Sequence, residues 1–228
     1  MLSAALPVNA SSFGGQIDSV YHYILVLVIF WFIVTEGLIL GFCLRYRRRP
    51  GQRSVHVRGD RKGQLAWVLV PALVVVCLDF SIDASSHRVW HAIKLEQPPP
   101  DIEVAVTGKQ FNWIFTYPGQ DGKLGTVDDV TIESELHVPV DKVVRLTLTS
   151  QDVIHSFWVP NLRLKQDVVP GRHIPIWFKA TKVGTWEIAC SELCGFGHYS
   201  MHGTLVVHDP ADYARWLHDH MTPAAAEK

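Results

Sequence analysis

The sequence of 228 residues lacks several patterns that would each assign it to a class of protein. It contains no internal repeat, which argues against a solenoid, and no C-x-x-C-H motif, which excludes an attached c-type haem. Residues 1–20 have neither a basic start nor a long apolar core, so we expect no cleavable signal peptide. The segment DGKLGTVDD, residues 121–129, lacks the closing glutamate of an EF-hand and is typical of a polar hairpin tip.

Net charge is also nearly absent, at −1, but the basic residues are unevenly distributed. Eight of the 21 lysines and arginines lie within residues 45–62, beside a single acidic residue, Asp60. The rest of the chain therefore carries 13 basic against 21 acidic residues, a net charge of −8. A run of eight cations is typical of a nucleic-acid patch or a solvated face, and only its flanks distinguish these from a membrane topology signal.

Two apolar segments flank the basic run. Residues 21–44 and residues 64–82 each approach the length of about 20 residues that a helix needs to cross a bilayer. The first segment ends directly on Arg45, and the second begins just after Lys62. Positive charge concentrated between two apolar spans favours membrane helices over buried core helices.

These features predict a transmembrane helical hairpin over residues 21–88 whose basic loop, residues 45–62, lies in the cytoplasm. The external N-terminal segment, residues 1–20, and the part of the chain after the hairpin then lie on the opposite side. In a bacterium this arrangement is that of an inner-membrane protein with a periplasmic domain. The basic loop is thus explained by topology, and we expect no nucleic-acid partner.

Residues 98–209 have the pattern of an exported all-β domain. The run PPPD, residues 98–101, breaks any helix that leaves the membrane. Turn residues separate segments that are rich in β-branched and aromatic side chains, which predicts a Greek-key sandwich or barrel. Residues 210–228 are expected to form a short helix, capped by Asp209, and a tail. The strands are expected at residues 102–107, 110–117, 130–138, 142–149, 174–180, 184–190 and 203–209.

The four cysteines follow the same division. Cys43 and Cys77 lie in the apolar spans, where each is expected to be a small buried hydrophobe. Cys190 and Cys194 lie in the exported domain, where an oxidising environment favours a disulfide.

The segment CSELCGFGHYSM, residues 190–201, contains other candidate metal ligands besides its two cysteines. It also holds His198 and Met201, and His155 lies upstream in QDVIHSFWVP. A disulfide would leave the histidines and the methionine unexplained. Zinc is held by two cysteines and two histidines in closed tetrahedral sites, but it seldom recruits a thioether. Copper accounts for every one of these side chains, because it prefers thiolate, thioether and imidazole ligands.

The number of thiolates indicates the kind of copper site. A mononuclear blue-copper centre uses one cysteine, two histidines and a weak axial methionine. Here Cys190 and Cys194 are close enough in sequence to bridge two copper ions, each completed by one histidine. Met201 is then a weak axial ligand of one ion, and a carbonyl near Glu192 serves the other. Such a site leaves no position open for a substrate, so it suits an electron relay.

The segments CSELCGFGHYSM and DVIHSFWVP resemble the CuA signature of cytochrome c oxidase subunit II. PGR (170–172), GTWEIAC, QFNW, QLAWVLVP and the two-helix anchor are also similar to that family. The resemblance implies a cupredoxin-like fold and a place in a respiratory terminal oxidase. A c-type cytochrome or a cytochrome domain would deliver electrons to the copper centre. The copper centre would pass these electrons to haem in subunit I, where oxygen reduction is coupled to proton pumping. The resemblance implies no catalytic residue in this chain.

The resemblance also implies individual roles. The implied copper ligands are His155, Cys190, Cys194, His198, Met201 and the carbonyl of Glu192. The side chain of Glu192 would reach a magnesium ion shared with subunit I. Electron entry is expected at Phe111 and Trp113, although many family members carry tryptophan at the position of Phe111. Gln64 replaces a glutamate at the mouth of a proton channel, and Asp60 is the nearest substitute if the helix extends that far.

Other ionisable residues have simpler interpretations. Four histidines without partners at ligand spacing are expected on the surface or in packing: His137, His173, His202 and His208. Glu36 and Asp79 fall within or near the apolar spans, where an ionisable group is costly and suggests a function.

Three alternatives to the oxidase subunit remain from the sequence. A quinol oxidase subunit II would lack the copper ligands that this chain keeps. A CuA-bearing subunit of a nitric oxide reductase differs only in its catalytic partner. A membrane-anchored copper carrier or assembly protein normally has an exchangeable metal site, whereas a full ligand set inside a sandwich favours retention of the metal.

Overall fold

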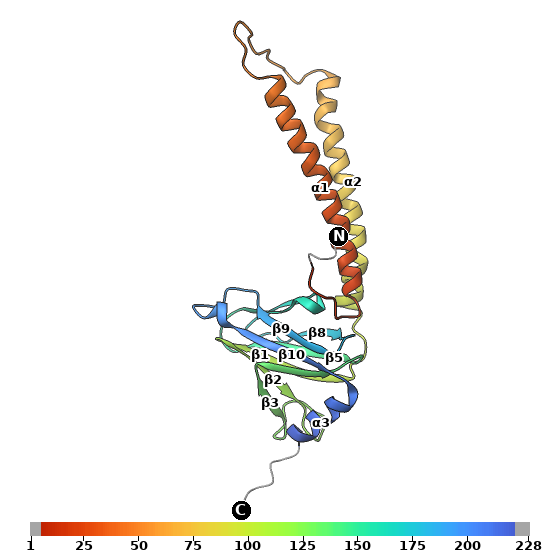
Figure 1. The fold of residues 1–228 in the computed structure, drawn as a ribbon, viewed down its shortest axis with the longest axis vertical. Coiled ribbons are helices and arrows are strands. Elements are labelled where there is room, and N and C mark those ends of the chain that lie inside the picture. The colour runs from red at the N-terminus through yellow and green to blue at the C-terminus, as the bar shows by residue number, and fades with distance from the viewer. Residues whose placement is uncertain (1–5, 222–228) are drawn as a thin grey trace, which may run out of the picture. The chain divides into compact units, whose positions relative to one another are not determined.

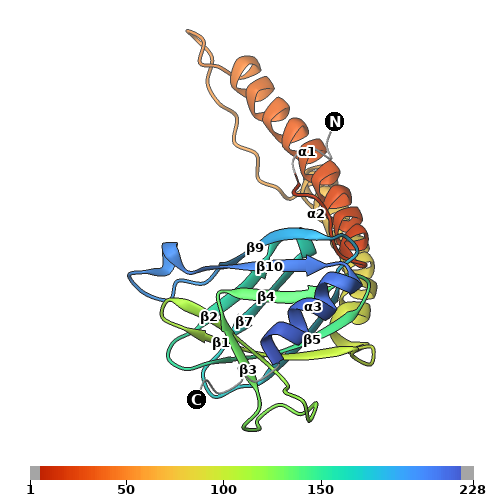
Figure 2. The same ribbon diagram turned by 60° about the horizontal axis from the view of Figure 1, so that its bottom comes forward.

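The computed structural model describes residues 6–221 of the chain. They divide into a helical unit, Gln16–His91, and a β-rich unit that comprises the described residues on both sides of it. Figures 1 and 2 show two long helices in the first unit and two layered sheets in the second. The fold class predicted from the sequence, a helical hairpin with an all-β domain, is confirmed.

The hairpin consists of α1 (Gly14–Arg45) and α2 (Lys62–Trp90), and α2 continues into a short π-helical turn, η2 (His91–Leu95). Both helices are long and apolar enough to cross a membrane, and the most apolar stretch of each is not buried within the chain. The Tyr23 hydroxyl is hydrogen-bonded to the Ser81 hydroxyl at 2.6 Å. Apolar side chains that the chain itself leaves uncovered fit contact with lipid or with other membrane subunits.

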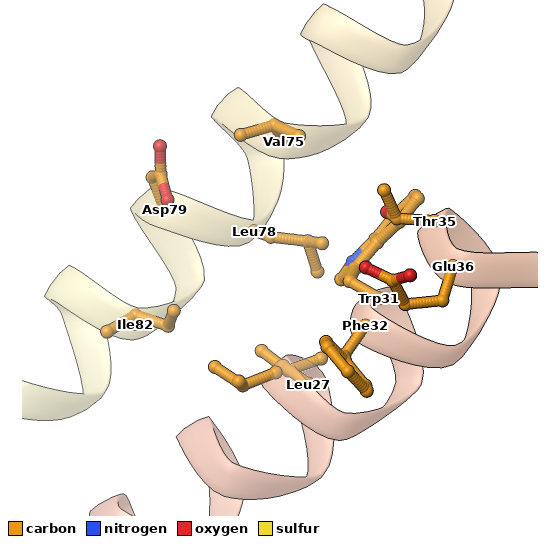
Figure 3. A pocket seen from close by; sticks show the side chains of 10 residues that line it. Leu27, Trp31, Phe32, Thr35, Glu36, Val75, Leu78, Asp79 and Ile82 are labelled. Carbon is orange, nitrogen blue, oxygen red and sulfur yellow. The ribbon is translucent and has the colours of Figure 1, made fainter. Parts of the chain in front are cut away.

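A groove of about 430 Å³ runs between the two helices. Its lining is mostly apolar, and Glu36 and Asp79 are its two acidic residues. Figure 3 shows the Glu36 carboxylate directed from α1 toward α2. Both carboxylates are exposed within this unit, and an ionised carboxylate in a bilayer is costly without a partner.

The start of α2 corrects one expectation from the sequence. The helix begins at Lys62, so Asp60 lies outside it in the preceding loop. Gln64 lies in the first turn, and its side-chain oxygen accepts a hydrogen bond from the Gly59 N–H at 2.9 Å. Asp60 therefore does not occupy the helical position, one turn before Gln64, that a substitute for the missing glutamate requires.

The β-rich unit contains two five-stranded sheets, with strand orders β3-β2-β1-β5-β8 and β4-β10-β9-β6-β7. β1 pairs in parallel with β5, and β10 with β4, whereas the other neighbours are antiparallel. The strands are β1 (Ile102–Lys109), β2 (Asn112–Tyr117), β3 (Val130–Glu133), β4 (Glu135–Pro139), β5 (Val143–Ser150), β6 (His155–Val159), β7 (Leu164–Val168), β8 (Ile174–Lys179), β9 (Gly184–Cys190) and β10 (His202–His208). β2 and β3 are antiparallel neighbours, so residues 121–129 form the predicted hairpin connection.

The core lies between the inner faces of the two sheets. Along β5, Val144, Leu146 and Leu148 are fully buried while the residues between them are partly exposed. Across the core, the Phe157 ring contacts the rings of Trp113 and Phe115 edge to face, with centroids 5.4 Å and 6.5 Å away. Burial of one such phenylalanine stabilises the fold by about 1.5–3 kcal/mol.

The structure divides one expected strand. Residues 130–138 form two strands because Ser134 adopts a left-handed conformation, with φ of 63°. Its N–H donates to the Trp113 carbonyl at 2.8 Å, and its carbonyl accepts from the Thr204 N–H at 2.7 Å. These two partners belong to different sheets, so Ser134 is where the chain passes from β3 in the first sheet to β4 in the second.

Two strands were not predicted. β6 is buried at four of its five residues, so it shows no alternation of polar and apolar side chains. β7 reads LKQDV and lies at the edge of its sheet, where only its first and last residues are buried. Both lack the period-two pattern by which a half-buried strand is recognised.

The C-terminal helix α3 (Pro210–Met221) begins as the sequence predicts. Asp209 Oδ1 accepts hydrogen bonds from the N–H groups of Ala211 at 3.0 Å and Asp212 at 3.1 Å. The Trp216 ring of α3 stacks on His137 of β4, with centroids 4.5 Å apart. The cap therefore sets the start of the helix, and the stack attaches it to the second sheet.

The segment before α1 belongs to the β-rich unit. Ala10 and Phe13 are buried, at 0% and 4% exposure. The Ala10 N–H donates to the Asn161 carbonyl, and the Thr181 N–H donates to the Ala10 carbonyl, both at 2.8 Å. Because α1 starts and α2 ends at this unit, the hairpin leaves the β-rich unit and returns to it.

The Tyr117 hydroxyl is a testable stabilising contact of the second sheet. It accepts the His137 N–H at 2.7 Å and donates to the His137 carbonyl at 3.1 Å. Burial raises the pKa of Tyr117 far above its usual value, so the hydroxyl stays a neutral donor. Tyr117→Phe should lower the free energy of unfolding by about 1–3 kcal/mol, because a buried N–H loses its partner.

Urea unfolding of the detergent-solubilised protein, followed by tryptophan fluorescence, measures this change. Tyr199→Phe removes the same hydroxyl from a ring that is 76% exposed and should change stability by less than about 0.5 kcal/mol. Equal losses in the two variants would contradict the assigned role of Tyr117.

Candidate metal centre

The predicted ligands gather at one end of the second sheet, where β10, β9 and β6 lie side by side. His155 is the first residue of β6, Cys190 is the last of β9, and Met201 directly precedes β10. The Cys190 N–H donates to the Met201 carbonyl at 3.1 Å, which joins two of these positions. The Ser191 N–H donates to the Ser156 carbonyl at 2.9 Å, which joins the end of β9 to β6 beside His155, the third position.

The connection between β9 and β10 supplies the other two ligands. Cys194 lies within it, and His198 begins a short 3-10 turn, η4 (His198–Ser200). The His198 N–H donates to the Gly195 carbonyl at 3.1 Å, and Gly195 has φ of 131°, a conformation that favours glycine. This turn brings His198 Nδ1 to 3.6 Å from Cys194 Sγ.

The sulfur and nitrogen atoms form a compact group. The sulfurs of Cys190 and Cys194 are 3.8 Å apart, and Met201 Sδ lies 3.7 Å from Cys194 Sγ. His155 Nδ1 lies 3.1 Å from Met201 Sδ and 4.0 Å from Cys190 Sγ. The candidate ligand atoms of His155 and the two cysteines all lie within 4.8 Å of one another.

The donor set fits a copper centre. The sulfur separation of 3.8 Å is far longer than the bond of about 2 Å in a disulfide, and both cysteines are free. Four of the side chains are nearly or fully buried, at 0% exposure for His155, 1% for Met201, 3% for Cys194 and 9% for Cys190. Two thiols, two imidazoles and a thioether in one buried group match the preference of copper for soft ligands.

The electrostatics of the cysteines also favour a cation. Burial, together with the charge of neighbouring Cys190, raises the pKa of Cys194 to about 11. With its pKa raised in this way, Cys194 keeps its proton at neutral pH. A metal ion that replaces the protons supplies the positive charge which the two thiolates need.

Two residues that the sequence analysis missed contact the ligands. Asp152 Oδ1 lies 2.8 Å from His155 Nε2, and Gln110 Nε2 donates to the Cys194 carbonyl at 2.6 Å. Burial opposes ionisation of Asp152, but hydrogen bonds from the Gln110 N–H, His155 and the Val153 N–H outweigh it and lower its pKa to about 2. Asp152 lies three residues before His155, and this short spacing is the one feature of the sequence that could have indicated its contact. The Gln110 contact joins residues far apart in the sequence, so no local pattern indicates it.

The two aromatic residues expected at electron entry lie on different sides of the site. Phe111 is half-buried under the ligand loop, where an added Cβ at Gly197 would lie 2.4 Å from its Cδ2 atom. Trp113 is fully buried, with its ring centroid 6.0 Å from that of His155. Phe111 is therefore the ring nearer to solvent, and Trp113 belongs to the core behind His155.

Glu192 has two expected roles, one for its backbone carbonyl and one for its side chain. Its backbone carbonyl accepts a hydrogen bond from the Cys190 thiol at 3.2 Å, so this oxygen faces the sulfur group. The residue is exposed, which leaves its side chain available to a partner outside the unit.

The remaining histidines lie apart from the centre. His202 is exposed, and its ring nitrogens contact Glu187 at 2.8 Å and the Tyr199 carbonyl at 2.9 Å. His173 is exposed. His137 and His208 have the partner that the sequence did not reveal, since their nitrogens lie 2.8 Å apart across β4 and β10.

Comparisons with known proteins agree with this geometry. The family model described as cytochrome c oxidase subunit II, periplasmic domain, matches residues 110–208. Cytochrome c oxidase subunit 2 of Thermostichus vulcanus is 35% identical, over 97% of this chain and 80% of the relative. An alternative cytochrome c oxidase subunit 2 of Bradyrhizobium diazoefficiens is 32% identical, over 91% of this chain and 81% of the relative.

A solved structure shows the same fold in the β-rich unit. The crystal structure of the periplasmic domain of subunit II of cytochrome oxidase from Bradyrhizobium japonicum has a TM-score of 0.50 and 34% identity. It covers 55% of this chain and 96% of its own length. Together with the buried group of sulfur and imidazole ligands, these matches show that the chain belongs to the cytochrome c oxidase subunit II family.

Proposed function

We propose that this chain is the electron-entry subunit of a respiratory haem–copper oxidase and holds a binuclear CuA centre. The observation that carries the proposal is the convergence of five donor side chains at one buried end of the second sheet. They are His155, Cys190, Cys194, His198 and Met201. Held by these side chains, a copper pair would supply a one-electron carrier between a donor protein and the haem of subunit I.

The chain's own residues suit a relay rather than a reaction centre. The cysteines, His155 and Met201 are buried, which limits the access of water to most of the ligand atoms. Strand hydrogen bonds hold Cys190, Met201 and Ser156 in fixed register. A ligand set fixed in this way changes little between oxidation states. Oxygen reduction and proton pumping are therefore assigned to subunit I.

The electron donor is proposed to dock beside Phe111. Three side chains of the ligand loop project into solvent there, at 77% exposure for Leu193, 95% for Phe196 and 76% for Tyr199. Exposed apolar side chains of this kind mark contact surfaces for other proteins. Since the chain outside the basic loop carries a net charge of −8, the donor is proposed to be a c-type cytochrome, or a cytochrome domain, with a basic docking face.

Two further features belong to the same proposal. The exposed Glu192 side chain is assigned as a ligand of a magnesium ion shared with subunit I. The hairpin is assigned to a bacterial inner membrane, with the β-rich unit in the periplasm, because the basic loop follows the positive-inside rule. The burial of Ala10 and Phe13 in the β-rich unit supports a shared side for the start of α1 and the end of α2.

The copper content of the purified full-length protein tests the proposal. We expect two copper ions per chain by mass spectrometry and a paramagnetic resonance pattern of one electron shared by two copper nuclei. Cys190→Ser should abolish that pattern, because a bridging thiolate is lost. Met201→Leu should keep it and shift the potential, because an axial thioether bonds weakly.

Cys77→Ser is the matched control, since it makes the same change in the helical unit and should alter neither copper content nor spectrum. A single copper ion with the pattern of one nucleus, or stoichiometric zinc, would refute the binuclear centre.

Phe111 provides a test of electron entry. Stopped-flow reduction of the copper centre by a reduced c-type cytochrome should slow by about tenfold in Phe111→Ala, or roughly 1.4 kcal/mol in the barrier. The rate in the unmodified protein should fall as salt screens the docking charges. Phe80→Ala, at an exposed position of α2, should leave the rate unchanged. If the rate is unchanged both by salt concentration and by Phe111→Ala, electron entry lies elsewhere.

The membrane topology is tested at Ser54, in the basic loop. In a Ser54→Cys variant, an impermeant maleimide added to intact cells should give no labelling, because this loop faces the cytoplasm. Lys123→Cys, in the exposed β2–β3 connection, should be labelled readily in the same cells. The reverse result would invert the topology.

A further inference from the structure

His155 is held at both ring nitrogens. Nδ1 faces the sulfur group, 3.1 Å from Met201 Sδ and 4.0 Å from Cys190 Sγ. Nε2 lies 2.8 Å from Asp152 Oδ1, on the opposite side of the ring. The imidazole is fully buried, so water does not compete for either nitrogen.

Asp152 is itself fixed by the backbone. Its Oδ2 atom accepts the Gln110 N–H at 2.7 Å, and its Oδ1 atom accepts the Val153 N–H at 2.7 Å. The side chain is 28% exposed, so the carboxylate lies at the rim of the buried site. Contacts from two separate segments therefore hold the carboxylate in one orientation.

Gln110 joins the same carboxylate to the ligand loop. While its N–H binds Asp152, its side-chain amide donates to the Cys194 carbonyl at 2.6 Å. The loop approaches so closely that a Cβ at Gly195 would lie 2.7 Å from Gln110 Nε2. One residue thus connects the support of the His155 imidazole with the backbone of the Cys194 thiol.

A purely local role for Asp152 explains only part of this arrangement. Aspartate often stabilises a turn by accepting a nearby N–H, as Asp152 does with Val153. That role requires neither the His155 contact nor the bond to Gln110, which is 42 residues away in sequence. A carboxylate that accepts the N–H of a ligand imidazole fixes its tautomer and ring orientation and increases its basicity.

We propose that Asp152 is a positioning residue for the metal centre. It keeps the proton of His155 on Nε2, leaves Nδ1 free to bind copper, and places a negative charge beside the ligand. Gln110 holds Asp152 and the Cys194 loop in a common frame. This inference rests on the proposed copper site and adds that Asp152 tunes the site's potential and its retention of copper.

Two substitutions in the full-length copper protein separate the roles of charge and hydrogen bond. Asp152→Asn keeps an oxygen for the His155 N–H but removes the negative charge, so the midpoint potential should shift upward with copper retained. Asp152→Ala removes both, so the potential should also shift upward. Copper loss to an excess of chelator should accelerate by about 10–100-fold, and the nitrogen hyperfine coupling of the ligand histidine should change.

Asp167→Ala is the matched control, since it removes a carboxylate from exposed β7, where it lies 3.7 Å from Lys165. It should leave potential, coupling and copper loss as they are. If Asp152→Ala fails to fold, the potential of Asp152→Asn still decides the proposal. An unmodified protein without copper would refute the copper site itself. An intact copper signal with unchanged potential and coupling in the Asp152 variants would refute the positioning role alone.

Discussion

The register between β10, β9 and β6 is the constraint on which the centre depends. A strand places alternate side chains on opposite faces, so a shift of one residue would move a ligand to the other face. The Cys190 N–H bond to the Met201 carbonyl and the Ser191 N–H bond to the Ser156 carbonyl prevent such a shift. These bonds therefore set the relative positions of His155, Cys190 and Met201, which lie on or beside the three strands.

The sheet also explains why thiols can be concentrated in one place. Cys194 and Cys190 lie 3.8 Å apart, and burial raises the pKa of Cys194. A bound cation would offset the negative charge of the two thiolates. The two thiols lie at one end of the domain. The buried rings of Trp113 and Phe157 pack behind them, and the turn at Gly195 shapes the ligand loop.

The sequence predicted those parts of the molecule that depend on local patterns. The hairpin followed from apolar length and flanking charge, the start of α3 from Asp209 and Pro210, and the ligand candidates from one short motif with His155 upstream. The passage between sheets at Ser134 was not predicted, because it depends on partners in β2 and β10. For the same reason Gln110 and the His137–His208 pair were missed, since their contacts join residues 84 and 71 positions apart.

The attachment of Ala10 to the β-rich unit has a consequence for biogenesis. The segment that contains Ala10 is synthesised before the hairpin, but its partners, Asn161 and Thr181, follow the whole hairpin and most of the strands. A contact between residues so far apart closes a long loop, and its entropic cost is met only when the late strands are in place. The segment that contains Ala10 can therefore dock only after residues 161–181 have been made.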